Sequence, residues 1–242
     1  MIARKMRWFL TVAVLATVGW VHAGALLVWD FSNIPSQNGY GHPAELARPV
    51  DGVDTSGLWL GAGVWNTGVT MAHAWGGHRF DVSEADAYSQ DVAFYFDVII
   101  APGLIVTFDS IQTPLYGSPT QSPEKGQWQY SLNGGAWENI GDEQSPLPHG
   151  VYDWLSLDLT GVTDLKEVSN ATVTFRLVLW GGTGGSNGRF YFGKGTASPI
   201  DPTFAGMPNT LTVNGTIVPE PSAAALLALS GIALLLRRRK RA

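Results

Sequence analysis

The stretch Val92-Ala93-Phe94-Tyr95-Phe96-Asp97-Val98 is the strongest indication of fold class in this 242-residue chain. Its apolar residues occupy every second position, and successive side chains of a β-strand point to opposite faces of a sheet. The same alternation returns in two other places, at Leu104, Val106 and Phe108 and at Val173, Phe175, Leu177 and Leu179. Each of these three strands is therefore expected to bury one face.

Working outward from these strands, the rest of the body also favours β-structure. Gly, Pro, Asn and Asp interrupt it at short intervals, and no stretch keeps a helical period for three turns. Further strands are expected at 26–31, 58–65, 69–73, 126–132, 136–140, 152–159, 188–192 and 210–217, and longer loops at 34–54, 113–125, 141–150 and 196–208. The pattern predicts an all-β fold, a two-sheet antiparallel β-sandwich, jelly-roll-like, of about nine to eleven strands.

One of these expected hairpins has a recognisable turn. Asn133-Gly134 lies between two aromatic segments, and both residue types accept the positive φ that a two-residue hairpin turn needs. Ser131, Asn133, Gly135 and Trp137 resemble the Asp-box hairpin of sialidases, with Asn133 in place of Asp and the Trp one position early. The alternative is a plain hairpin, and the box itself has a structural role in those families.

The N-terminus reads as a secretory signal peptide covering residues 1–25. Arg4, Lys5 and Arg7 form a basic region, and an apolar stretch of signal-peptide length follows from Trp8 to Val21. Small residues at Ala23 and Ala25 then supply a signal peptidase site, with cleavage expected after Ala25 or, alternatively, after Ala23. An uncleaved N-terminal membrane anchor is the other possibility.

The C-terminus, residues 218–242, carries three features in a fixed order. Pro219-Glu220-Pro221 is a stiff, extended segment, because each proline fixes its own φ and restricts the residue before it. The apolar stretch 223–236 would form a helix of about 21 Å, short for a bilayer core of about 30 Å. A cluster that favours the cytoplasmic side follows it, consisting of Arg237, Arg238, Arg239, Lys240 and Arg241.

This order resembles the PEP-CTERM sorting signal of bacterial exported proteins. The resemblance implies that an exosortase, a membrane-embedded transpeptidase, reads Pro219, Glu220 and Pro221 and removes the tail. It also implies a precursor held in the inner membrane by the short transmembrane helix, followed by release to the cell surface or the extracellular, exopolysaccharide-containing matrix. The alternative is an ordinary C-terminal membrane anchor. The resemblance covers the tail alone and says nothing about the ligand of the body.

Charge restricts the partners of the body. The segment from Leu26 to Val218 holds 7 basic and 19 acidic residues, a formal charge near −12. Such a body repels nucleic acid and anionic lipid. It also repels anionic polysaccharide, unless a cation such as Ca²⁺ bridges the two.

No catalytic or metal site stands out. The chain has no cysteine, which excludes disulfides and thiolate chemistry. The carboxylate clusters at 81–86 and 142–143 read more simply as polar loops than as a glycosidase pair. His73 and His78 lack a third metal ligand, and no sequence signature supports Ca²⁺ binding, so no cofactor is expected.

Tryptophan content is the most suggestive feature of the body. Eight tryptophans lie between Leu26 and Val218, and exposed rings can stack on sugars, although most rings in a sandwich fill its core. Trp75 and Trp137 lie near glycine turns and are predicted to be exposed carbohydrate contacts.

Three functions remain open at this point. The first is a non-enzymatic structural or interaction protein of the cell surface or extracellular matrix. The second is a carbohydrate-binding module of the exopolysaccharide matrix, and the third is a polysaccharide-active enzyme. The first is the primary expectation, because the sorting signal is the most specific feature of the sequence.

Overall fold

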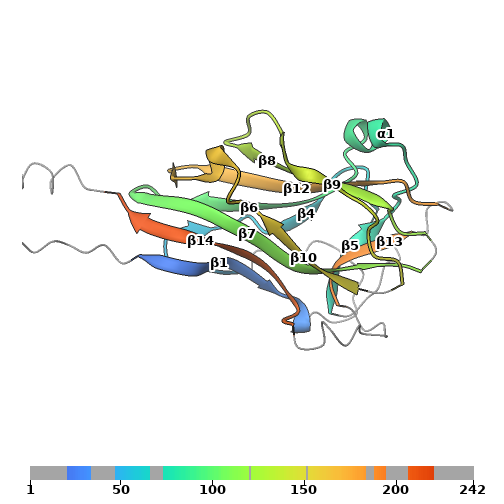
Figure 1. Cartoon of the computed structure of the whole chain (residues 1–242), viewed down its shortest axis with the longest axis horizontal. Helices are drawn as coiled ribbons and strands as arrows, with labels where there is room; N and C mark the ends of the chain where they lie inside the picture. The colour runs from blue at the N-terminus through green and yellow to red at the C-terminus, as the bar shows by residue number, and fades with distance from the viewer. Residues whose placement is uncertain are drawn as a thin grey trace, which may run out of the picture.

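The computed structural model describes residues 21–33, 47–65, 73–119, 121–150, 152–183, 188–194 and 207–220. These residues form a two-sheet β-sandwich in which every pair of neighbouring strands is antiparallel, as predicted (Figure 1). In the described residues no helix is long and apolar enough to cross a membrane. The predicted helix 223–236, the cluster 237–241 and the basic N-terminal region all lie outside these residues.

The eight-stranded sheet has β14 and the long strand β7 near its centre. Its strands are β1 (His22–Asp30), β2 (Ala47–Pro49), β5 (Ala74–His78), β7 (Leu104–Gly117), β10 (Tyr152–Asp158), β11 (Val168–Ser169), β13 (Arg189–Gly193) and β14 (Thr210–Pro219). The path β2-β1-β14-β7-β13-β5 forms its main order, and β10 and β11 pair with β7.

The six-stranded sheet lies against it and has the order β3-β6-β12-β8-β9, with β4 also pairing with β6. Its strands are β3 (Val53–Asp54), β4 (Leu58–Leu60), β6 (Ala93–Ile100), β8 (Lys125–Leu132), β9 (Glu138–Gln144) and β12 (Thr172–Trp180). Three short helical segments are η1 (Phe31–Asn33), α1 (Glu84–Ser89) and η3 (Thr163–Leu165).

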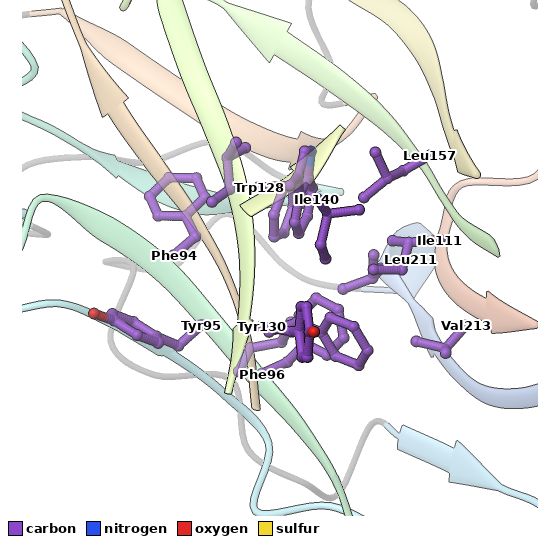
Figure 2. Packing of buried hydrophobic residues seen from close by; sticks show 14 of the residues in the cluster. Phe94, Tyr95, Phe96, Ile111, Trp128, Tyr130, Ile140, Leu157, Leu211 and Val213 are labelled. Carbon is purple, nitrogen blue, oxygen red and sulfur yellow. The ribbon is translucent and has the colours of Figure 1, made fainter. Parts of the chain in front are cut away.

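The core is the aromatic layer between the two sheets. The alternating residues predicted to face inward on β6 and β12 have no exposed surface: Phe94, Phe96, Val98, Val173, Phe175, Leu177 and Leu179. Figure 2 shows Phe96 directed toward Ile111 and Leu211, whereas the hydroxyl of Tyr95 points away from that cluster. The period of two therefore gives β6 an apolar inner face and an outer face that carries polar groups such as the Tyr95 hydroxyl.

The predicted hairpin between β8 and β9 is confirmed at its turn. Asn133 and Gly134 have φ values of 50° and 71°, the positive values that the sequence led us to expect. The side chain of Asn133 also accepts a hydrogen bond from the Thr172 amide (2.9 Å), and the Ser131 hydroxyl donates to the Gly135 carbonyl (2.9 Å). The hairpin is thereby attached to the start of β12.

Three of the predicted loops are partly wrong. The segment 34–54 contains β2 and β3, the segment 113–125 contains the end of β7, and the segment 141–150 contains the end of β9. Strand β7 continues through Pro114, because Pro114 lies between the residues that pair with β14, ending at Gln112, and those that pair with β13, starting at Leu115. A residue in that gap needs no N–H for either ladder.

Two further differences concern short elements. The expected strand 58–65 ends at Leu60, and the loop 81–86 contains the start of α1, whose N-cap is Ser83. The Ser83 hydroxyl accepts a hydrogen bond from the Asp86 amide (3.2 Å), which explains why a short helix begins there. A six-residue helix is too short for a periodic pattern to reveal.

The first and last strands extend beyond the predicted limits of the body, 26 and 217. His22 to Ala25 pair with Asn214 to Ile217, and Pro219 pairs with Leu104. Ala23 and Ala25 of the expected signal peptidase site are exposed in β1, and Glu220 donates its amide hydrogen to the Gly103 carbonyl (2.9 Å). Pro221 lies outside the described residues.

Candidate functional site

The outer face of the six-stranded sheet carries a row of large polar and aromatic side chains. Cross-strand register aligns one residue from each of five adjacent strands. We call them the outer row: Trp59 on β4, Tyr95 on β6, Arg176 on β12, Gln129 on β8 and Asn139 on β9. None of these residues belongs to the inward alternation that fills the core.

Hydrogen bonds run outward from Arg176 to both sides of the outer row. Arg176 Nε donates to Gln129 Oε1 (2.7 Å), and Gln129 Nε2 donates to Asn139 Oδ1 (2.7 Å). On the other side, Arg176 Nη1 donates to the Tyr95 hydroxyl (3.1 Å), which donates to Asp91 Oδ1. Every hydrogen bond in this network uses a different donor group, so all of them can form together. Together they fix the orientation of each side chain.

Aromatic contacts complete the arrangement. Trp59 stacks on Tyr95 with ring centroids 5.5 Å apart and planes 5° apart. Trp137 lies over Arg176, with the guanidinium carbon 4.0 Å from its ring centroid, and meets Tyr95 edge-on at 5.8 Å. Two tryptophan rings are thus held in place by the tyrosine and the arginine between them.

Burial divides this group into two parts. We call the buried residues Tyr95 and Gln129 the floor, and the more exposed residues the rim. Tyr95 and Gln129 are 7% exposed, whereas Trp59, Trp137 and Arg176 are partly exposed and Asn139 is exposed. Burial raises the pKa of Tyr95 to about 12, and its hydrogen bond to Asp91 acts in the same direction. The phenol therefore stays neutral and keeps donating to Asp91 at physiological pH.

Both ends of this outer face are closed by other parts of the chain. At one end Val178 and Trp180 are buried, and Tyr88 of α1 contacts the Trp180 ring at 6.2 Å. At the other end the buried Asp97 carboxylate accepts hydrogen bonds from Thr55 Oγ1 (2.9 Å), the Ser56 amide (2.6 Å) and the Ser56 hydroxyl. Among the described residues, the outer row therefore lies between two covered ends of this face.

The structure separates the two predicted carbohydrate contacts. Trp75 is 2% exposed and packs among Phe94 and Phe192, so the expectation that it would be exposed is wrong. The glycines after it belong to strand β5 rather than to a turn, which places Trp75 on the inner face. Trp137 is partly exposed, and its ring lies over Arg176 of the outer row.

Sequence reasoning missed two better-placed tryptophans. Trp59 is the outward neighbour of the inward-facing Leu58 and Leu60, a signal that the alternation of β4 contained. Trp65 is 45% exposed, and its backbone pairs with His78 through hydrogen bonds of 3.1 and 2.9 Å. No local pattern could have shown this second exposure, because it depends on where β5 lies.

The other residues considered for chemistry are held in structural contacts. Asp86 accepts a hydrogen bond from Ser83 at the start of α1, and Glu143 pairs with Lys125 at 2.9 Å. Hydrogen bonds from Ser32 and from Thr160 lower the pKa of Asp30 and of Asp158, respectively. That direction is opposite to the raised pKa of a general acid.

The described residues contain no group of three or more His, Cys, Asp or Glu side chains able to hold a metal ion. His73 precedes strand β5 and His78 is its last residue, so the segment between the two histidines is a strand and not a turn.

No family model and no curated protein match the chain. Among solved structures, the chain is similar to a carbohydrate-binding module specific for non-crystalline cellulose, CBM28, with a TM-score of 0.36 and 11% identity, covering 69% of this chain and 94% of that one. It is also similar to TmCBM61 in complex with β-1,4-galactotriose, with a TM-score of 0.26 and 10% identity, covering 70% of this chain and 83% of that one. Similarities this distant assign neither a family nor a ligand to the chain.

Proposed function

We propose that the protein is a polysaccharide-binding protein that contacts sugar rings through the outer row and Trp137. The observation that carries this proposal is the alignment of Trp59, Tyr95, Arg176, Gln129 and Asn139 across five strands of one outer face. The partly exposed rings of Trp59 and Trp137 offer apolar surface to the faces of sugars. The guanidinium group of Arg176 and the amide of Asn139 offer hydrogen bonds to hydroxyls.

The fixed orientation of these side chains supports binding rather than simple solubility. Binding costs conformational entropy when a flexible side chain must be ordered. Trp137 is already held over Arg176, and Arg176 is held by Gln129 and Tyr95, so little further ordering is needed. The pattern also needs no reactive group, which agrees with a binding role without catalysis.

The terminal segments supply the proposed location. We infer from the basic and apolar N-terminus and from the Pro-Glu-Pro tail that the body is exported and then delivered to the cell surface or matrix. Mass spectrometry of the mature C-terminus tests this part: a C-terminus that is the same in cells with and without exosortase would contradict the sorting proposal.

A second candidate function is a structural or interaction protein with no sugar ligand. The stacking of Trp59 on Tyr95 favours it, because rings that contact one another also stabilise a sheet without any ligand. The two candidates differ in what the removal of a ring would change. Binding requires the rim residues, whereas a structural role requires only the fold.

The test uses the full chain, purified in a detergent with a polyoxyethylene headgroup, since detergents with sugar headgroups would compete for the site. Depletion from solution by insoluble polysaccharides and quenching of tryptophan fluorescence by soluble ones would measure binding. Amorphous cellulose, galactan, xylan and starch are the neutral probes, and alginate and pectate, with and without Ca²⁺, are the acidic ones.

Saturable binding is expected, and Trp59→Ala and Trp137→Ala should each weaken it strongly. Trp154→Ala is the matched control, because Trp154 is also partly exposed but lies in β10 of the other sheet. Absence of binding to every probe, or equal loss in all three variants, would reject the proposal and leave the structural role.

A further inference from the structure

A second Trp–Arg–Gln group lies outside the outer row. The Arg79 guanidinium carbon is 4.8 Å from the ring centroid of Trp65, and Arg79 Nη2 donates to Gln90 Oε1 (3.4 Å). This repeats the chemistry of Trp137, Arg176 and Gln129, where the guanidinium carbon is 4.0 Å from the ring and the hydrogen bond is 2.7 Å long. We call these groups the Trp65 group and the Trp137 group.

In both groups an arginine supports the tryptophan from one side. The ring of Trp65 also meets His78 edge-on at 5.8 Å and is 45% exposed, so it is fixed yet open to a ligand. The ion pairs found among the described residues join Arg48 to Asp30 and Lys125 to Glu143, and neither Trp-stacked arginine takes part. Each arginine therefore keeps donor capacity for a ligand beside its ring.

A rigid segment connects the two groups. Residues 61–65, the connecting segment, run beside residues 91–93, with hydrogen bonds from the Gly61 amide to the Ala93 carbonyl (2.8 Å) and from the Gly63 amide to the Asp91 carbonyl (3.1 Å). A Cβ atom at Gly61 would lie 2.1 Å from the Asp91 carbonyl oxygen, so the contact is close enough to require glycine.

Asp91 links this segment to the outer row. One of its carboxylate oxygens accepts a hydrogen bond from the Ala62 amide (3.1 Å), and the other accepts one from the Tyr95 hydroxyl. Because Gln90 is its chain neighbour, the contacts run without a break from the Trp65 group through Asp91 and Tyr95 to the Trp137 group. The path leads from the edge of one sheet onto the outer face of the other.

We propose that the two groups are separate contact points for a single extended, neutral polysaccharide chain. This inference rests on the proposed function and specifies its ligand class. Two fixed aromatic contacts joined by a rigid path suit a polymer better than a single sugar, because the second contact adds affinity only to a ligand long enough to reach it. The charge near −12 disfavours a polymer that carries an acid on each unit.

The proposal predicts how affinity depends on ligand length. The probes are oligosaccharides, from the disaccharide to the octasaccharide, of each neutral polymer that the full chain binds. Affinity is expected to rise by roughly tenfold once the ligand reaches the second group, as one well-formed aromatic contact can provide. Trp65→Ala should abolish that rise and leave the affinity for short ligands unchanged, whereas Trp137→Ala should weaken binding at every length.

Each outcome has a definite meaning. If the protein binds neutral polymers but affinity does not rise with length, or if Trp65→Ala has the effect of the Trp154→Ala control, the two-contact proposal is wrong while the proposed function stands. Tighter binding of the acidic probes than of the neutral ones would overturn the ligand class. If no probe binds, both proposals fall. Near-ultraviolet circular dichroism and the unfolding temperature of each variant show whether a loss of binding reflects a loss of fold.

Discussion

Aromatic side chains lie on both faces of the six-stranded sheet, but their neighbours differ between the two faces. On its inner face, Phe96 packs against Trp29, Trp128 and Phe175, with ring centroids between 5.2 and 6.3 Å apart and no polar side chain among these contacts. On its outer face, the neighbouring Tyr95 contacts two tryptophans, but an arginine, a glutamine and an aspartate are interleaved with them.

The difference shows what aromatic content alone does not reveal. Rings surrounded by rings exclude water and stabilise the fold, because most of their surface is apolar and all of it is buried. Rings held by cations and amides keep part of their surface exposed while their orientation stays fixed. The polar neighbours therefore distinguish the outer face from the core more clearly than the number of tryptophans does.

The largest effect on stability is expected when one ring is removed from the inner face. Phe96→Ala should lower the free energy of unfolding by about 3–5 kcal/mol, since it leaves a cavity in the aromatic layer. Urea unfolding followed by tryptophan fluorescence measures the loss. Tyr95→Phe is the matched control one position away and should cost less than about 2 kcal/mol, because only hydrogen bonds are lost. Equal losses would mean that the two faces contribute to stability alike.

Substitution of Asp97, the buried carboxylate at the end of the outer face, tests whether that end of the face takes part in ligand binding. Asp97→Ala should cost about 2–3 kcal/mol of stability, because the Ser56 amide and two hydroxyls lose their acceptor. Polysaccharide binding at a temperature well below unfolding should remain unchanged. Loss of binding in this stable variant would extend the site over the end of the face that Thr55 and Ser56 close.

High pH should weaken the floor of the outer row. The folded-state pKa of Tyr95 is raised to about 12 from 10.0, so its contribution is complete below pH 10 and is lost as the pH rises toward the folded value. Stability should therefore fall between about pH 10 and about pH 12, and the fall should be smaller in Tyr95→Phe. Tyr130 and Tyr191, whose pKa values are also about 12, keep some dependence in the variant. Urea midpoints at both pH values measure the difference.

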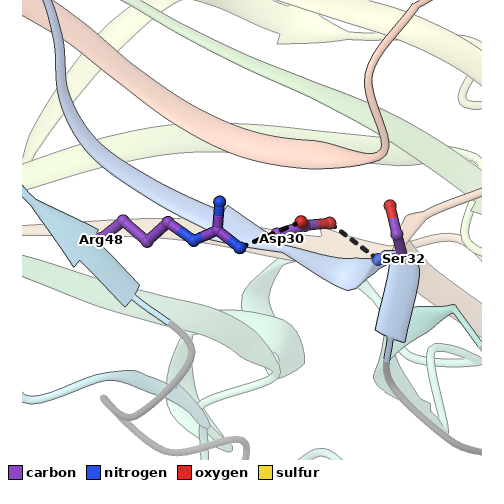
Figure 3. A network of polar contacts seen from close by, with 3 residues as sticks. All are labelled: Asp30, Ser32 and Arg48. Carbon is purple, nitrogen blue, oxygen red and sulfur yellow. Dashed lines mark hydrogen bonds and ion pairs between the residues drawn. The ribbon is translucent and has the colours of Figure 1, made fainter.

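The smallest effect is expected at an exposed ion pair. Arg48 Nη2 lies 3.5 Å from Asp30 Oδ2, and the arginine side chain is 73% exposed (Figure 3). The lowered pKa of Asp30 arises first from the Ser32 hydrogen bonds, with Arg48 the smallest cause. Arg48→Ala should change stability by less than about 0.5 kcal/mol. A larger loss in urea unfolding would show that cations without ring contacts also matter here.

The sandwich and much of its inner face could be predicted from the sequence, because a period of two is a local property. The period of two correctly placed Phe94, Phe96 and Phe175 inside. The Asn-Gly pair correctly predicted the turn at Asn133 and Gly134. The jelly-roll-like character and the sorting signal stay predictions. The predicted loop 113–125 was wrong at its start, because β7 continues through Pro114 at the point where its pairing passes from β14 to β13.

The candidate site was harder to predict, because it depends on register between distant strands. Arg176 and Tyr95 are far apart in the sequence, and only strand pairing brings them into one row. Trp137 was identified from its position after a glycine turn, while the same reasoning failed for Trp75 because its glycines form a strand. A turn signal indicates exposure only where the chain does turn.

The pairing of β1 with β14 has a consequence for maturation. His22 to Ala25 lie beside Asn214 to Ile217, with β7 on the other side of β14 (Figure 1). If a signal peptidase cuts after Ala25, β14 would keep one neighbour there instead of two, and its free backbone groups would form a new sheet edge. Trimming the start of the chain would thus loosen the strand that leads into Pro219 and Glu220.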